Sequence, residues 1–305
     1  MKNLPLLSAF AFLISISCQA QRFSIGIQSG FAIGIPDAQH HAYSTYRYSA
    51  ATSNVVEELE SVNSSMGMGV PINLELGYTT KFGLSFAVAG GYNHGLGFNV
   101  IRKDIYDNGE DVYEHTFTGN YFHVSPTIGM LIRVKRIGLS LKAGPSVAFV
   151  NYKNEINASI LANQNGRTDE HYWLRSYKGP VTIGAKVNFD VECFLKNERF
   201  SLLFGIGYTH LSFSPTSSEL EVYQVNRRDN IESLSTNERY AEYENNQTIN
   251  YPVDIDGNVD WNQNEDEPYQ GYRWDVPFDN LAINIGFKVY FGKKAKETDN
   301  KKAPQ

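Results

Sequence analysis

Hydrophobic and polar residues alternate along much of the chain. In the stretch VTIGAKVNFDVE, residues 181–192, the odd positions are Val, Ile, Ala, Val, Phe and Val, and the even positions are Thr, Gly, Lys, Asn, Asp and Glu. A period of two residues predicts a β-strand with one apolar face and one polar face. The other segments of the chain decide which of these faces points inward.

Eight segments share this alternation, and the connections between them alternate in length. The segments are residues 22–35, 70–79, 84–98, 121–132, 137–149, 177–192, 200–213 and 280–291. Short turns at 80–82, 134–136 and 195–198 alternate with a hairpin tip at 107–110 and with long loops at 36–69, 154–172 and 215–275. This layout predicts an all-β chain, an eight-stranded antiparallel up-and-down transmembrane β-barrel with short periplasmic turns and long extracellular loops. An even number of strands places both mature termini in the periplasm.

The residue types on the two faces indicate which face of each strand points out of the barrel and which points into it. Large apolar side chains occupy one parity, and the other parity carries Gly, Ala, Ser, Asn and charged residues. A soluble barrel needs bulky aliphatic residues inside, so the apolar face is expected to contact lipid and the polar face to line the lumen. A secreted β-sandwich is the alternative, but it explains neither the loop asymmetry nor the polar parity.

Aromatic residues cluster near the ends of the predicted strands. Such a distribution is typical of the girdles at the two membrane–water interfaces. The expected girdle residues are Phe82, Tyr172, Trp173, Tyr177, Phe194, Phe200, Trp274, Phe278 and Phe291.

The two ends of the chain differ from the strands. Residues 1–20 read as a signal peptide, with a basic start, an apolar run and cleavage after Ala20. A lipoprotein acceptor at Cys18 is the alternative, although Ser15 replaces the large aliphatic residue expected three positions earlier. Residues 21–291 form the barrel, and residues 292–305 form a lysine-rich periplasmic tail. Removal of the signal peptide leaves Cys193 as the sole cysteine, so no internal disulfide is expected.

Four stretches resemble a known family. They are AQRFSIGIQSGFAIG, YFHVSPTIGMLI, LKAGPSVAF and AINIGFKVYF. They are similar to the small outer-membrane β-barrel proteins of the Bacteroidota, the PorT-like relatives of the OmpA-type barrel. The resemblance covers the strands and not the loops. It implies an outer-membrane location and a barrel architecture, and it implies no chemistry.

Charged residues on the lumen parity form the first candidate site. They are Glu75, Lys142, Lys186, Asp190, Glu192 and Lys288. Charges in a narrow lumen should pair, and an eight-stranded barrel is filled by side chains, so a closed polar network is favoured over a small ion-conducting pore. Lys186 is expected to pair with an acid of a neighbouring strand. Asp190 and Glu192 are expected near the periplasmic turn, toward Arg133 and Lys196.

A His-x-Ser pair near the end of the seventh segment is the second candidate. His210 and Ser212 share the lipid-facing parity, which is similar to the arrangement in the lipid A deacylase family. That resemblance implies a His base, a Ser nucleophile and an acid to orient the His, here Glu219 or Glu221. The family's following Asn and its Asn-Pro-Gly segment are missing, so this low-probability hydrolase remains an alternative to a non-enzymatic protein.

The loops carry the expected partner contacts. Tyr and Trp give a large contact area at low entropic cost, which suits protein or glycan recognition or assembly within a membrane complex. The loop candidates are Tyr43, Tyr46, Tyr48, Tyr240, Tyr243, Trp261 and Tyr272. The net charge of −6 argues against nucleic acid, and neither a cofactor nor a metal site is expected. The acidic stretch 254–267 lacks the EF-hand pattern and is interpreted as a solvated loop.

Overall fold

A computed structural model describes residues 22–35, 38–49, 52–106, 109–161, 167–195, 198–244 and 266–291. These segments are almost entirely strands of one large, mainly antiparallel sheet, with a 3-10 turn at Ile231–Ser233 and one short helix, α2 (Thr236–Arg239), in the described part. The expected signal peptide, the expected tail and most of the acidic stretch 254–267 lie outside these residues.

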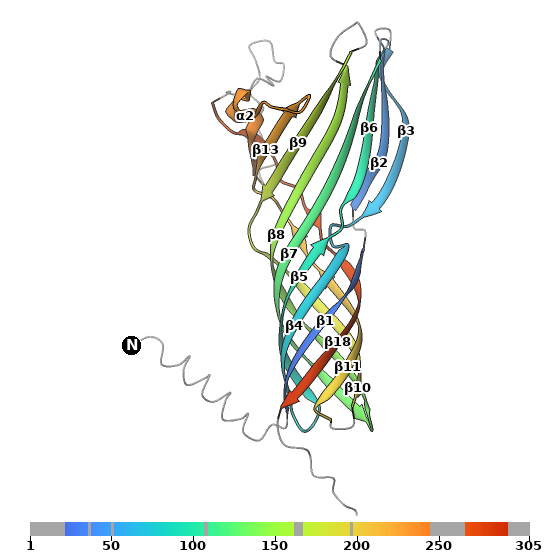
Figure 1. Ribbon diagram of the computed structural model, residues 1–305, viewed down its shortest axis with the longest axis vertical. Helices are drawn as coiled ribbons and strands as arrows, with labels where there is room; N and C mark the ends of the chain where they lie inside the picture. Colours follow the sequence, from blue (N-terminus) through green and yellow to red (C-terminus); the bar gives the residue numbers. More distant parts are fainter. Residues whose placement is uncertain are drawn as a thin grey trace, which may run out of the picture.

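Eight strands form a ring in the lower half of the molecule (Figure 1). They are β1 (Arg22–Gly34), β4 (Gly69–Thr79), β5 (Leu84–Gly95), β7 (Gly109–Val134), β8 (Ile137–Leu161), β10 (Thr182–Phe194), β11 (Phe200–His210) and β18 (Asn280–Phe291). Each strand pairs antiparallel with both neighbours, and β18 returns to β1 with Phe23 opposite Phe291. The expectation of an all-β chain with eight antiparallel strands is confirmed.

The strands of the ring bury one parity and expose the other. In β11 burial alternates at every residue, with Leu202 and Phe204 exposed and Ser201 and Leu203 buried. Because side chains alternate across a strand, every second residue of each strand points into the ring. The interior therefore holds the small and charged residues, and the outer wall carries the large apolar ones.

Above the ring, two strands continue into an open sheet, which we call the extension. It consists of the upper parts of β7 and β8 together with β6 (Phe98–Tyr106), β2 (Ala38–Ser49), β3 (Thr52–Ser64), β9 (Thr168–Lys178), β13 (Ser217–Val225), β14 (Arg228–Asp229), β15 (Tyr240–Glu244) and β16 (Tyr269–Tyr272). β7 and β8 are 26 and 25 residues long, so they run without interruption from the ring into the extension (Figure 1).

The extension corrects the expected loops. The ranges 36–69, 154–172 and 215–275 contain strands where irregular connections were expected, and Tyr177 belongs to β9, not to the ring strand β10. The third strand ends at Gly95 and the seventh at His210, both earlier than expected. The free edges of β7 and β8 explain the difference, because their unpaired backbone groups are satisfied by the added strands.

An apolar cluster closes the ring where the extension begins. We call it the mouth cluster, and it consists of Met66, Tyr121, Ala148, Tyr152, Leu211, Phe213, Val276 and Phe278. β12 (Ser212–Phe213) and β17 (Val276–Pro277) pair with each other. This pairing places the Phe213 side chain, and the Phe278 side chain directly after β17, in the cluster. Phe278 makes edge-to-face contacts with Tyr121 at 5.9 Å and with Phe213 at 6.3 Å.

Some aromatic residues that were expected in the interfacial girdle lie inside the molecule instead. Phe278 is fully buried, Phe194 is buried at the opposite end of the ring, and Tyr177 points inward against Tyr152 at 4.8 Å. Aromatic residues at strand ends therefore divide between the wall and the interior. A position near the end of a strand therefore does not tell whether an aromatic residue lies on the outer wall or in the interior.

Truncation of an aromatic side chain in the mouth cluster should lower the free energy of unfolding far more than truncation of an exposed aromatic side chain. We expect Phe278→Ala to lower the free energy of unfolding by about 3–5 kcal/mol, because the side chain is fully buried. Phe82→Ala, at a turn residue that is 78% exposed, should change it by less than about 0.5 kcal/mol. Equilibrium urea unfolding of both variants checks this, and equal losses would contradict the placement of Phe278.

Candidate functional site

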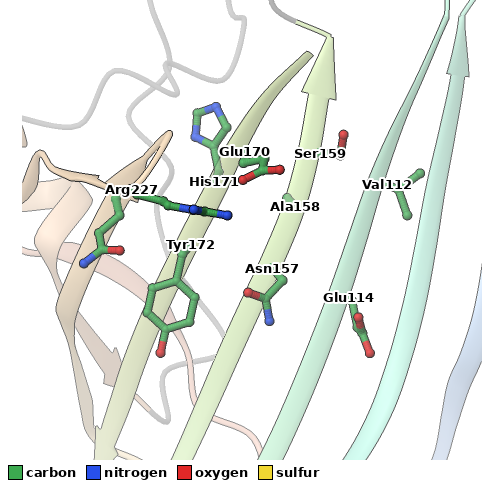
Figure 2. Close-up of a pocket in the computed structure, with 10 residues that line it drawn as sticks. Val112, Glu114, Asn157, Ala158, Ser159, Glu170, His171, Tyr172 and Arg227 are labelled. Carbon is green, nitrogen blue, oxygen red and sulfur yellow. The ribbon is translucent and has the colours of Figure 1, made fainter.

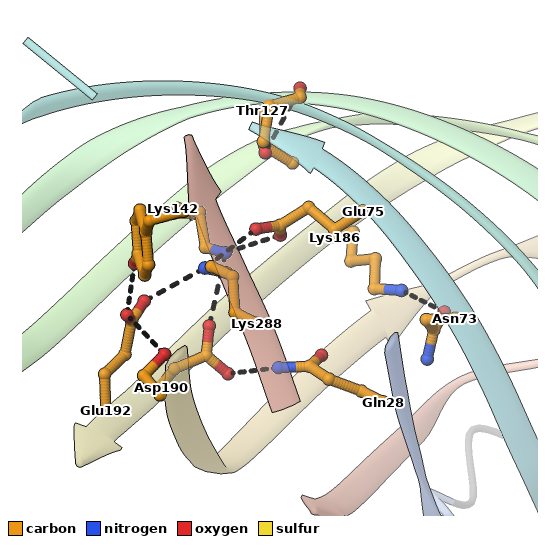
Figure 3. A network of polar contacts seen from close by, with 12 residues as sticks. Gln28, Asn73, Glu75, Thr127, Lys142, Lys186, Asp190, Glu192 and Lys288 are labelled. Atoms are coloured by element: carbon orange, nitrogen blue, oxygen red, sulfur yellow. Dashed lines mark hydrogen bonds and ion pairs between the residues drawn. The ribbon is translucent and has the colours of Figure 1, made fainter. Parts of the chain in front are cut away.

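The six charged residues expected to face one another lie together inside the ring (Figure 3). Each is buried, with Lys142 and Glu192 only 1% exposed. Glu75 comes from β4, Lys142 from β8, Lys288 from β18, and the other three from β10. Four strands that are distant in sequence therefore contribute to one interior cluster.

Five of these residues form a continuous chain of ion pairs. The Lys142 ammonium lies 2.5 Å from Glu75 and 3.3 Å from Asp190, and the Lys288 ammonium lies 3.1 Å from Glu75 and 2.9 Å from Glu192. Two lysines thus bridge three carboxylates. The order is Asp190, Lys142, Glu75, Lys288, Glu192, and we call it the interior charge chain.

Neutral side chains complete the two ends of the interior charge chain. Gln28 donates to Asp190 at 3.1 Å, and the Tyr290 hydroxyl donates to Glu192. Ser201 also donates to Glu192, at 3.4 Å. Buried charges are tolerated when they are paired and hydrogen-bonded, and both conditions hold here.

Lys186 departs from the expected pairing. Its ammonium donates to the Asn73 side-chain oxygen at 3.0 Å and contacts His123 Nε2 at 2.9 Å, and no carboxylate of the described residues lies within ion-pair distance of it. The prediction of an acidic partner was wrong because Lys142 and Lys288 already engage the interior carboxylates. His123, which the sequence reading did not single out, takes the role of partner.

Asp190 and Glu192 were expected near the turn that follows β10, toward Arg133. Glu192 does lie at that end of β10, opposite Gly138, which in turn lies opposite Arg133, but among the described residues neither carboxylate forms an ion pair with Arg133. Arg133 instead pairs with Glu198 at 3.0 Å, in the turn between β10 and β11, and Arg22 pairs with the same carboxylate at 3.1 Å. Hydrogen bonds from Arg133 and Arg22 hold the pKa of Glu198 below its usual value. Lys196 lies outside the described residues.

The His-x-Ser pair faces outward but has a different acid from the one expected. The His210 Nδ1 atom lies 2.7 Å from Asp279, which also accepts a hydrogen bond from the Leu211 amide. Glu219 instead pairs with Lys178 at 3.2 Å, and Glu221 pairs with Lys153 at 2.8 Å. No hydrogen bond between His210 and Ser212 is present in the described part. The geometry provides an oriented His without an activated nucleophile.

The loop candidates occupy strands of the extension. Tyr43, Tyr46 and Tyr48 lie in β2, and Tyr240, Tyr243 and Tyr272 lie in β15 and β16, whereas Trp261 is outside the described residues. The Tyr243 ring packs edge-on against Trp274 at 4.6 Å. It is therefore part of the packing of the extension as well as a contact candidate.

The inward face of the extension carries a hollow of about 410 Å³ that the sequence reading missed. It is lined by Arg102, Asp104, Tyr113, His115, Ile156, Trp173, Arg175 and Leu220. We call this surface the concave site. Two pairs of residues in the sequence could have indicated this site. Tyr113 and His115 are two residues apart in β7, and Trp173 and Arg175 are two residues apart in β9, so each pair lies on one face of its strand. The second pair was not recognised because residues 154–172 were expected to form a loop, whereas β9 begins at Thr168.

A second hollow of about 450 Å³ lies across the same strands (Figure 2). Glu114 of β7, Asn157 of β8 and Tyr172 of β9 line it, each one residue away from a concave-site residue, so they project to the opposite side of the sheet. Arg227 reaches into it from the turn after β13, where its φ of 66° is in the left-handed region. Glu114 and Glu170 make this surface more acidic than the concave site.

Loss of one lysine from the interior charge chain should destabilise the fold. We expect Lys142→Met to lower the free energy of unfolding by about 3–5 kcal/mol, because Glu75 and Asp190 are left buried with one fewer cation. Glu75→Gln in the same background should recover part of the loss. Lys178→Met is the control, since this lysine is 68% exposed in its pair with Glu219 and should change stability by less than about 1 kcal/mol. Urea unfolding curves measure all three.

Among the described residues, no helix has the length and apolar character required to cross a membrane. In the same part of the chain, no three His, Cys, Asp or Glu side chains lie close enough together to hold a metal ion. Comparison with models of protein families and with curated proteins finds no match for the chain.

Proposed function

We propose that the chain is a non-enzymatic outer-membrane β-barrel protein. Its wall lies in lipid, its interior is closed, and its extension makes surface contacts with a protein or glycan, alone or within a membrane complex. The observation that carries this proposal is the inverted distribution of side chains in the ring. Large apolar residues cover the outside, and buried charges fill the inside.

The exposed apolar surface is continuous around the ring. Ile128 on β7, Leu141 on β8 and Ile285 on β18 are 54%, 55% and 59% exposed, and comparable residues occur on all eight strands. Water-soluble proteins rarely expose a contiguous apolar patch larger than a few hundred Å². Lipid removes the free-energy cost of this exposed apolar surface. The eight strands pair around a closed ring, which is the arrangement that a membrane-spanning sheet requires.

The asymmetry of the two ends supports the orientation. At one end the ring has only tight turns, where Lys81, Lys135 and Arg136 are found, and at the other end it continues into the extension. Outer-membrane barrels have short periplasmic turns and longer extracellular segments. On this basis the extension is extracellular, and both mature termini are periplasmic. The predicted signal peptide and the resemblance to PorT-like barrels agree with this location.

The interior does not favour the pore alternative. The mouth cluster fills one level of the ring, and the interior charge chain fills another. Eight strands leave an interior just wide enough for side chains. A closed ring serves as an anchor, and the recognition surface is then the extension.

The lipid A deacylase alternative has one supporting observation, the contact between His210 and Asp279 on the outer surface. The missing bond between His210 and Ser212 weighs against it. We therefore expect His210→Ala and Ser212→Ala to leave lipid A acylation unchanged in cells that express the protein. Mass spectrometry of extracted lipid A measures this, and acyl loss that depends on both residues would establish the enzyme.

An arginine placed in the middle of the wall should lower the free energy of unfolding in lipid far more than an arginine placed at the edge of the wall. Ile285 is central in β18, so Ile285→Arg should lower stability in lipid by about 2–4 kcal/mol. Ile183 is 76% exposed near the upper end of β10, and Ile183→Arg should lower it by no more than about 1 kcal/mol. Urea unfolding in phospholipid vesicles, together with the shift in gel migration on boiling, measures both. Equal, small effects would mean that the wall faces water.

A further inference from the structure

Arg175 is a half-buried cation without an acidic partner in the described part of the chain. Its guanidinium donates to the Ser218 hydroxyl at 3.0 Å and to the Glu238 backbone carbonyl at 2.9 Å. Both partners are neutral, so they hold the group in place without neutralising it. A guanidinium has five donors, so these two bonds do not use all of them, and Arg175 lines the concave site.

The carboxylates on the same face are already engaged. Asp104 pairs with Arg102 at 3.0 Å, and Asp111 accepts a hydrogen bond from the Leu161 amide at 2.7 Å. Burial lowers the pKa of His115 below its usual value, so this side chain is neutral near pH 7. Among the described residues that line the concave site, Arg175 is therefore the charge that a ligand would meet without an acidic partner.

Aromatic side chains line the same hollow as Arg175. Trp173 stacks with His171 at 5.2 Å and with Tyr223 at 5.8 Å, and His115 stacks with Phe117 at 5.9 Å. Rings fixed in a sheet lose little entropy on binding and offer apolar faces with polar edges. Such a surface fits a ligand with a flat C–H face.

We propose that the concave site binds a sugar acid, a residue of the uronate type whose carboxylate is held by Arg175 and whose ring rests on Trp173. A fixed guanidinium matches the two oxygens of a carboxylate, which accounts for the anionic group. The hollow of about 410 Å³ is at the lower end of the range for small-ligand sites and accommodates one or two sugar rings. A folded protein partner would need about 800 Å² of surface, far more than this hollow offers.

This inference rests on the proposed role of the extension in surface contacts, and it narrows the ligand to acidic glycans. The test is isothermal titration calorimetry of the full chain in detergent micelles. The probes are trigalacturonic acid, its methyl ester and uncharged maltotriose. We expect binding of the acid, with at least 10-fold weaker binding of both neutral probes and weaker binding of the acid at high salt, because the contact is electrostatic.

Three substitutions and one control test the roles of Arg175 and Trp173. Arg175→Gln should weaken binding of trigalacturonate by 10-fold or more, and Trp173→Leu should weaken it by about 2- to 10-fold. Arg167→Gln should leave it unchanged, because Arg167 is 72% exposed, pairs with Asp169 and does not line the hollow. Arg175→Lys keeps the charge and loses the planar fork, so intermediate binding by this variant separates a specific contact from misfolding.

The outcomes are distinguishable. Equal binding of trigalacturonate and its ester, or unchanged binding by folded Arg175→Gln, would overturn the inference. Hexaglutamate serves as a fourth probe, and if it bound more tightly than trigalacturonate, that would overturn the sugar class and assign the site to acidic peptides. The barrel proposal is measured separately by gel migration on boiling, which is independent of ligand. Failure of the ligand test with a normal migration shift would therefore reject the inference alone.

Discussion

The interior charge chain is the interaction on which the rest of the structure depends. An eight-stranded ring is too narrow for water to solvate a lysine fully, so each interior charge needs a partner on another strand. Lys142 and Lys288 meet this need by bridging Glu75, Asp190 and Glu192, and they join β4, β8, β10 and β18 across the ring. Glycines make room for the long side chains. A Cβ at Gly205 would lie 2.3 Å from Asp190 Oδ1, and one at Gly129 would lie 2.7 Å from Lys142 Cγ.

This interior dictates what the wall must be. With charged and small residues inside, the large apolar residues of these strands occupy the outer face, and this distribution is the basis of the proposed membrane location. The same alternation explains why the sequence predicted the ring well. Each ring strand carries a strong contrast between its two parities, as Val187 and Lys186 illustrate in β10. A slip of one residue would reverse every side chain, so the register is firmly specified.

The sequence predicted less where this contrast disappears. In β9, polar and aromatic residues such as Tyr172, Trp173 and Arg175 occupy both faces, so the segment looks like a loop although it continues the sheet. The partner of Lys186 could not be inferred either, because spacing within one strand carries no information about distances across the ring. Phe278 shows a third limit. Its position near a strand end fits an interfacial girdle and an interior cluster equally well.

The ring and the extension hold their buried charges in different ways. Within the ring, two lysines pair with three carboxylates, and Lys186 is held nearby by Asn73 and His123. In the extension, Arg175 donates to Ser218 and to a backbone carbonyl, and no acid among the described residues forms an ion pair with it. Holding a cation this way has a free-energy cost that a carboxylate ligand would offset. Because β8 runs from the ring into the extension and pairs with β9 from Tyr152 to Leu161, the strand that carries Arg175 is joined to the ring by a ladder of backbone hydrogen bonds, which would hold the proposed binding surface in a fixed position.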